Sequence, residues 1–171
     1  MRSLYVAAAA VAFAATPAFA QDAAPTFSGA HIGVIAGVDS LHGGGDSETG
    51  VAFGITGGYD IRKNNAVFGL ELEAADSTVS QSGVSASRDL YAGLRVGVVA
   101  SDHALIYLKA GYTNARASFA GTGTNFDGFR AGAGVEWAIG QHLSIRGEYR
   151  YSNYQDGLSR NQGVIGLGYR F

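Results

Sequence analysis

The final nine residues, Gly163-Val164-Ile165-Gly166-Leu167-Gly168-Tyr169-Arg170-Phe171, decide how this sequence is interpreted. Large apolar side chains occupy every second position, and glycine or a charged residue occupies most of the positions between them. A period of two is the signature of a β-strand whose two faces meet different surroundings. At the exposed edge of a sheet, such a strand would promote aggregation through its unpaired backbone. Closing the sheet into a barrel removes the edge.

Seven earlier segments alternate in the same way, although Ile35 breaks the pattern of the first. The expected strands therefore span residues 27–39, 51–61, 66–74, 88–99, 104–113, 128–139, 143–152 and 163–171. Short turns alternate with long, flexible loops, which are expected at residues 40–50, 76–87, 114–127 and 153–162. An even number of strands with this loop rhythm is typical of bacterial outer-membrane barrels, whose short turns are periplasmic. We predict an all-β fold, an eight-stranded antiparallel up-and-down transmembrane β-barrel over residues 27–171.

The N-terminus has the features of a secretory signal peptide at residues 1–20. Arg2 supplies the positive charge, Leu4 to Ala15 form a short apolar core, and Ala18-Phe19-Ala20 fits the small-x-small cleavage pattern. Cleavage is expected between Ala20 and Gln21, which leaves residues 21–26 as a short periplasmic lead-in. The predicted location is the bacterial outer membrane.

Composition excludes two other classes of protein. The formal net charge is −2 with no basic stripe, which argues against a nucleic-acid partner. No apolar run of about 18 residues follows the signal peptide, so a helical membrane span is not expected. Charged residues make up only 15% of the chain, against about 25% in soluble domains, so the composition also differs from that of a typical soluble domain.

Parity alone leaves the direction of the two faces open, because a soluble lipocalin-like barrel carries its apolar side chains inside. The minor face here consists mainly of glycine with charges of both signs, unlike a water-facing surface. Balanced charges favour pairing inside a narrow lumen, where an unpaired charge is costly. The predicted lumen charge network is Asp60, Glu71, Glu73, Arg95, Lys109, Arg130, Glu136, Arg146, Glu148, Arg150 and Arg170.

Aromatic residues on the apolar parity fall near both ends of the strands, with small aliphatic residues between them. Two such belts are expected where rings lie at the two interfaces of a membrane. The short-turn belt is predicted to contain Tyr59, Phe68, Trp137, Tyr169 and Phe171, and the long-loop belt Phe53, Tyr112, Phe129, Tyr149 and Tyr151.

The run from Gly134 to Ala138 and from Leu143 to Tyr151 resembles the strand-turn-strand of small outer-membrane β-barrel proteins of the OmpA/OmpX-like, porin-family class. The terminal Gly-Tyr-Arg-Phe resembles the C-terminal aromatic signal read by the barrel-assembly machinery, which makes Phe171 the expected assembly signal. The resemblance implies insertion in the outer membrane, contact with its lipids and lipopolysaccharide, and delivery by periplasmic chaperones. It implies no single activity, because function belongs to sites rather than folds. A monomer is expected.

Catalysis is not expected. In lipid A deacylase barrels a histidine lies two residues before the nucleophilic serine, but Arg150 takes that position before Ser152. Arginine stays protonated and cannot act as a general base. The four histidines show no metal-ligand spacing, so neither a metal nor a cofactor is expected.

Two functions of different class follow from these patterns. The first is a structural or surface-interaction role through four external loops, with a surface ligand that the sequence does not identify. The alternative is a narrow passive pore for small solutes or ions, because the interior of an eight-stranded barrel is just wide enough for side chains to fill.

Overall fold

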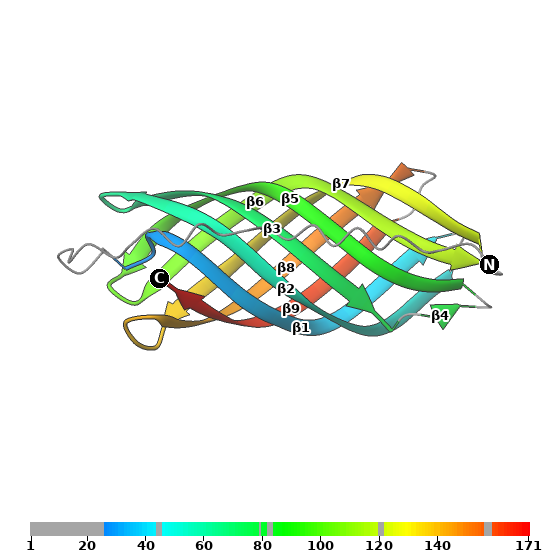
Figure 1. The fold of residues 1–171 in the computed structure, drawn as a ribbon, viewed down its shortest axis with the longest axis horizontal. Coiled ribbons are helices and arrows are strands. Elements are labelled where there is room, and N and C mark those ends of the chain that lie inside the picture. Colours follow the sequence, from blue (N-terminus) through cyan, green and yellow to red (C-terminus); the bar gives the residue numbers. More distant parts are fainter. Residues whose placement is uncertain (1–25, 44–45, 79, 82–83, 120–121, 156–158) are drawn as a thin grey trace, which may run out of the picture.

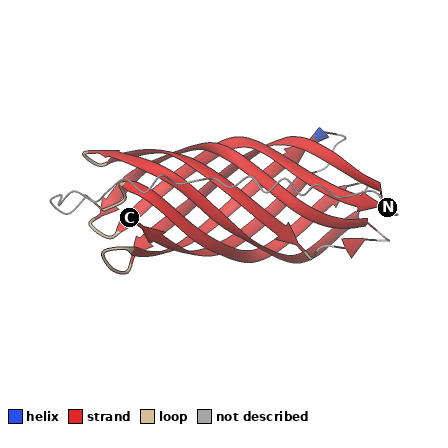
Figure 2. Cartoon of the chain, in the orientation of Figure 1, coloured by secondary structure: helices blue, strands red, loops and turns tan. Residues whose placement is uncertain are grey.

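The computed structural model describes residues 26–43, 46–78, 80–81, 84–119, 122–155 and 159–171. The expected signal peptide, its cleavage site between Ala20 and Gln21, and most of the lead-in lie outside these residues. Strands make up nearly all of the described chain (Figure 2). Within this part of the chain, no helix is long and apolar enough to cross a membrane.

Eight long strands form one closed antiparallel barrel (Figure 1), as predicted. They are β1 (Gly29–Gly43), β2 (Asp46–Lys63), β3 (Ala66–Ser77), β5 (Val84–Ser101), β6 (Ala104–Phe119), β7 (Thr122–Ala138), β8 (Leu143–Tyr154) and β9 (Ser159–Arg170). Each strand pairs with its neighbours in the sequence, and β9 pairs with β1 to complete the circle. The two-residue strand β4 (Ser80–Gln81) adds a small hairpin to β5, while β3 pairs directly with β5.

The C-terminal stretch is the strand that closes the barrel. Val34 faces Leu167 in the β1–β9 register, and the Phe171 amide donates a hydrogen bond of 3.0 Å to the Ala30 carbonyl. The apolar alternation of this stretch therefore runs beside the apolar alternation of β1. Because both edges of the sheet are paired here, the closure removes the edge that the sequence pattern made hazardous.

The tight turns lie at one end of the barrel, together with the C-terminus and the start of β1 (Figure 1). Asn64 links β2 to β3 with a φ of 54°, a left-handed conformation that asparagine tolerates. By the rule for outer-membrane barrels, the end with the short turns is periplasmic and the opposite end is external.

The external ends of the strands differ from the prediction, because the expected long loops are largely strand. Pairing of β1 with β2 continues to Gly43 and Asp46, and pairing of β6 with β7 continues to Phe119 and Thr122. The bounds expected for the loops at 40–50, 76–87, 114–127 and 153–162 were therefore wrong. The prediction ended each strand where apolar alternation ended, but an antiparallel sheet beyond the membrane needs no apolar face.

Large apolar side chains point outward along the barrel. Ile165 and Leu94 are 72% and 66% exposed, whereas charged residues such as Arg95 and Glu71 are almost completely buried. Ile35, which broke the alternation of the first strand, points inward and is 4% exposed. This orientation is the reverse of a soluble ligand-carrying barrel.

Candidate functional site

The barrel interior holds seven carboxylates and seven cationic side chains among the described residues. They are Asp39, Asp60, Glu71, Glu73, Asp89, Glu136 and Glu148, with Arg95, Lys109, Arg130, Arg146, Arg150, Arg160 and Arg170. The structure places all eleven residues of the predicted charge network in this set. The ion pairs between them divide the set into two networks, each with equal numbers of positive and negative groups.

The four-residue ring consists of Asp60, Arg95, Glu136 and Arg170, near the periplasmic end. Arg95 lies 2.5 Å from Asp60 and 2.8 Å from Glu136. Arg170 contacts the same two carboxylates at 3.0 and 3.1 Å, which closes the ring. Because the ring joins β2, β5, β7 and β9, it ties the closing strand to both halves of the barrel wall. His31 lies beside it, with Nδ1 3.5 Å from Asp60.

The ten-residue network contains the other charged groups and is centred on Lys109. The Lys109 ammonium lies 2.7 Å from Glu71, 2.8 Å from Glu148 and 3.6 Å from Glu73. Arg146 contacts the second oxygen of Glu71 at 2.7 Å. A single ammonium with three carboxylates around it is stable in a buried site only because further cations neutralise the excess charge.

Toward the external end, the ten-residue network continues through three arginines. Arg150 and Arg130 contact Glu73 at 2.5 and 3.2 Å, and Arg130 also pairs with Asp89. Arg160 lies 2.9 Å from Asp89 and forms an ion pair with Asp39. Pairs such as Arg150 with Glu73, from β8 and β3, and Arg160 with Asp89, from β9 and β5, therefore cross the lumen.

Sequence reasoning missed Asp39, Asp89 and Arg160 as members of this network. Asp39 and Asp89 have the lumen parity of their strands, since they align with His31 and Tyr91 respectively. Arg160 shares the parity of Gly166 and Arg170, but it fell within a predicted loop. Asp39 and Asp89 lay within predicted strands and could have been assigned to the lumen by parity, whereas Arg160 required extending the alternation of the last strand before Gly163.

A layer of apolar side chains, also missed, lies inside the barrel next to the periplasmic end. This apolar layer consists of Phe27, Val67, Val99, Leu105, Tyr107 and Ala138, which form one buried cluster. Tyr107 connects it to the charged interior, because the Arg95 guanidinium lies 4.7 Å from the centre of its ring. Charged groups therefore fill the lumen only from the four-residue ring toward the external end.

The residues predicted for the aromatic belts all point away from the lumen, and each residue has 42% to 65% of its surface exposed. Tyr112 faces Phe129 across β6 and β7 in the expected long-loop belt. Tyr169 and Phe171 form an edge-to-face pair with centroids 5.1 Å apart in the short-turn belt. Rings at both ends of an apolar band are the arrangement expected at two membrane interfaces.

Comparison with known proteins agrees with this geometry. Residues 6–171 match the family model of the outer membrane protein beta-barrel domain. The chain belongs to this family. Its members lie in the bacterial outer membrane, and the apolar band of this barrel accordingly faces the lipids of that membrane. No curated protein matches the sequence.

Several solved structures share the fold of this outer-membrane barrel. Neisserial surface protein A has 17% sequence identity and a TM-score of 0.64, with 84% of this chain and 98% of that chain covered. Ail of Yersinia pestis, in complex with the heparin analogue sucrose octasulfate, has 14% identity and a TM-score of 0.61, with coverage of 85% and 99%. A de novo designed transmembrane β-barrel has 19% identity and a TM-score of 0.50, with coverage of 84% and 97%.

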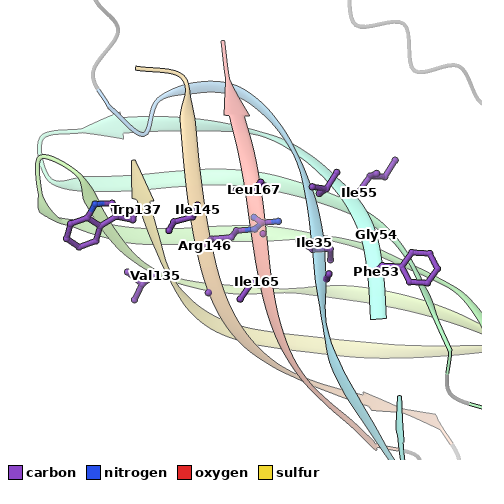
Figure 3. Close-up of a pocket in the computed structure, with 14 residues that line it drawn as sticks. Ile35, Phe53, Gly54, Ile55, Val135, Trp137, Ile145, Arg146, Ile165 and Leu167 are labelled. Carbon is purple, nitrogen blue, oxygen red and sulfur yellow. The ribbon is translucent and has the colours of Figure 1, made fainter. Parts of the chain in front are cut away.

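A groove in the wall of the outer-membrane barrel is lined by residues of β1, β2, β7, β8 and β9 (Figure 3). Val34, Ile145, Ile165 and Leu167 belong to its lining and are all exposed on the outer surface. Since these side chains lie in the apolar band, hydrocarbon chains of the bilayer cover them.

The candidate nucleophile, Ser152, lies inside the lumen rather than at this outer groove. Ser152 is fully buried, and its hydroxyl accepts a hydrogen bond of 2.8 Å from Arg130 Nε. The residues that face Ser152 in the register, Arg130 and Arg160, are both arginines, which do not act as general bases. The described residues contain no group of three or more histidines and carboxylates arranged to hold a metal ion.

Proposed function

We propose that this barrel has a structural and surface-interaction role, in which the external hairpins contact molecules outside the cell. The observation that carries the proposal is the filled lumen. Arg95, Arg130 and Arg150 are each at most 2% exposed and extend across the interior to carboxylates on other strands. A barrel whose interior is occupied in this way offers its outer surface, rather than its lumen, for interaction.

The shape of the external end supports the same proposal. The β6–β7 pairing continues past the aromatic pair Tyr112 and Phe129 as far as Phe119 and Thr122. This places a paired sheet, rather than a loose loop, beyond the long-loop belt. A paired backbone holds a binding surface in one conformation and so lowers the entropy that is lost on binding.

An experiment on whole cells tests the role of this hairpin. Residues 116–125 would be replaced by a two-residue Asn-Gly turn, which preserves the hairpin topology. Binding of cells that display each form to epithelial cells and to immobilised heparin would be measured. Heparin is a suitable first probe because Ail was solved with a heparin analogue. We expect the shortened form to lose binding while keeping the heat-dependent gel shift of a folded barrel. Equal binding by both forms would refute the proposal for this hairpin.

A narrow pore is the second candidate function, and buried polar atoms favour it. Among the described residues, both side-chain polar atoms of Gln162, the Arg150 Nε and Nη2 atoms, and the Tyr91 hydroxyl are buried without a hydrogen-bond partner. Such atoms are usually satisfied by water. A file of water along these residues would provide a path for very small solutes.

Single-channel recording distinguishes the two functions. If the lumen conducts, Gln162→Ala should raise the conductance of the refolded barrel, because it removes a lumen side chain without breaking an ion pair. Val164, the next inward-facing residue of β9, is 4% exposed and provides the matched variant Val164→Ala. Absence of any conductance above the lipid background, in both variants and in the parent protein, would exclude the pore.

We also propose that the protein is a monomer that contacts lipopolysaccharide in the outer leaflet. Periplasmic chaperones would deliver it, and the barrel-assembly machinery would recognise Phe171. The exposed ring of Phe171 at the end of the closing strand supports this last role, because it is 65% exposed and free to meet a receptor. No catalytic role is assigned to Ser152.

A further inference from the structure

The chain just before β1 turns inward rather than continuing along the wall. Phe27 has a φ of 65° and Gly29 has a φ of 97°, so two left-handed residues flank Ser28. Glycine adopts this conformation without steric cost, but phenylalanine does so only when the surrounding structure compensates for the strain. The compensation for Phe27 must therefore come from its side chain or from contacts of its neighbours.

The Phe27 side chain supplies that compensation by packing inside the barrel. Its residue exposure is 1%, and it belongs to the apolar layer with Val67, Val99, Leu105 and Ala138. These partners come from β3, β5, β6 and β7, which lie on the opposite side of the circle from the β1–β9 closure. The ring of Phe27 thus enters from one side of the periplasmic opening and packs against the other.

One arginine holds the preceding residue in place. Arg62 at the end of β2 donates from Nη1 to the Thr26 carbonyl at 2.9 Å and from Nε to the Asn64 carbonyl at 2.8 Å. The same guanidinium therefore binds the segment before Phe27 and the turn between β2 and β3. Breaking this link would free the segment while leaving the members of the apolar layer unchanged, since Arg62 is not one of them.

The layer that Phe27 completes lies between the periplasmic opening and most of the charged interior, although the Arg170 side chain of the four-residue ring keeps 11% of its surface exposed. Asp60 of the four-residue ring faces Gly29 in the β1–β2 register, two residues from Phe27. Both ring nitrogens of the neighbouring His31 are buried without a hydrogen-bond partner. Polar groups of this kind lie directly behind the apolar layer, so water that passed the layer would reach them at once.

We infer that Phe27 is a plug that closes the periplasmic mouth of the barrel, and that Arg62 holds it shut. The flanking Ser28-Gly29 segment is the hinge about which the plug would swing outward. This inference does not depend on whether the protein acts through its hairpins or as a pore. If the protein acts through its hairpins, the plug restricts access of periplasmic water to the charged lumen, and if it acts as a pore, the plug must move before the lumen conducts.

The absence of cysteine from the sequence allows a direct test. Val67→Cys places a nearly isosteric thiol in the apolar layer, at a position with 0% exposure. The rate of its modification by a charged, water-soluble methanethiosulfonate would be measured on refolded protein in detergent micelles. We expect Phe27→Ala to raise this rate at least tenfold and Phe27→Leu, which keeps an apolar plug, to leave it low.

Two further variants complete the test. Phe68→Ala removes an outward-facing phenylalanine from the same end of the barrel and should leave the rate unchanged. Arg62→Gln removes the link to Thr26 and leaves the members of the apolar layer unchanged. We expect it to raise the modification rate severalfold. This variant also tests the inference if Phe27→Ala does not fold. If Phe27→Ala folds and is modified at the same rate as the parent protein, the inference is overturned. If only Arg62→Gln folds, an unchanged rate in that variant overturns it.

Discussion

The Tyr107 hydroxyl donates a hydrogen bond of 2.8 Å to Glu148 Oε2. The same tyrosine stacks with Arg95 of the four-residue ring, whereas Glu148 belongs to the ten-residue network through Lys109. Tyr107 is therefore a link between two charge networks that are otherwise separate in their ion pairs. Each network is neutral by itself, so this link contributes through hydrogen bonding and packing rather than through charge balance.

Tyr107→Phe should lower the free energy of unfolding by about 1–3 kcal/mol, because it removes a donor from a buried carboxylate. The matched control is Tyr149→Phe, whose hydroxyl donates a hydrogen bond of 2.6 Å to Asn161 on the exposed outer surface. We expect the control to cost less than about 1 kcal/mol, since water can replace the lost hydrogen bond. Urea unfolding in lipid vesicles would measure both, with Trp137, the single tryptophan, as the fluorescent reporter. Equal losses in the two variants would show that burial of the Glu148 contact has no effect.

Lys109→Met should destabilise the barrel by about 3–5 kcal/mol, because it leaves buried carboxylates without their central cation. Lys63→Met is the control, since Lys63 is exposed at the end of β2. Adding Glu148→Gln to Lys109→Met restores the balance of charge, and Arg150 keeps its contact of 2.5 Å with Glu73. We therefore expect the double variant to lose less stability than the sum of the single variants. Strict additivity in urea unfolding would mean that the ion pairs act independently.

The alternation of side chains was sufficient to predict the number of strands, their order and the faces they present. It was sufficient because each strand passes between lipid and a polar lumen, so every second residue reports one environment. The same rule did not reach Arg160, because outside the membrane the outward positions become polar and the contrast disappears. Asp39 lay at the end of a predicted strand, but it was not assigned to the lumen network. The rule could not predict Phe27 either, since a left-handed turn at an aromatic residue depends on partners from distant strands.

Contacts between inward rings and glycines also depend on the register, which parity does not supply. Tyr107 faces Gly134 across β6 and β7, and a Cβ atom at Gly134 would lie 2.7 Å from the tyrosine Cζ and hydroxyl oxygen. Gly134→Ala should therefore cost about 1–3 kcal/mol through overpacking. Gly147 faces outward, and a Cβ atom there would meet nothing within 4 Å. We expect Gly147→Ala to be neutral or slightly stabilising, as measured by the urea midpoint in vesicles. A loss at Gly147 as large as that at Gly134 would contradict this account of the glycines.

Phe171→Ala separates the role of the last residue in assembly from its role in stability. The Phe171 ring is 65% exposed and contacts Tyr169 edge to face, so its loss should lower stability by less than about 1.5 kcal/mol. If the ring is the feature that the barrel-assembly machinery reads, the variant should accumulate poorly in the outer membrane yet refold normally in detergent. Phe68→Ala is the control, because Phe68 is an outward ring of the same belt that does not end the chain. Quantification of the heat-shifted band in membrane fractions and after refolding would supply both measurements. Normal accumulation of the Phe171 variant in cells would show that assembly reads another feature of the closing strand.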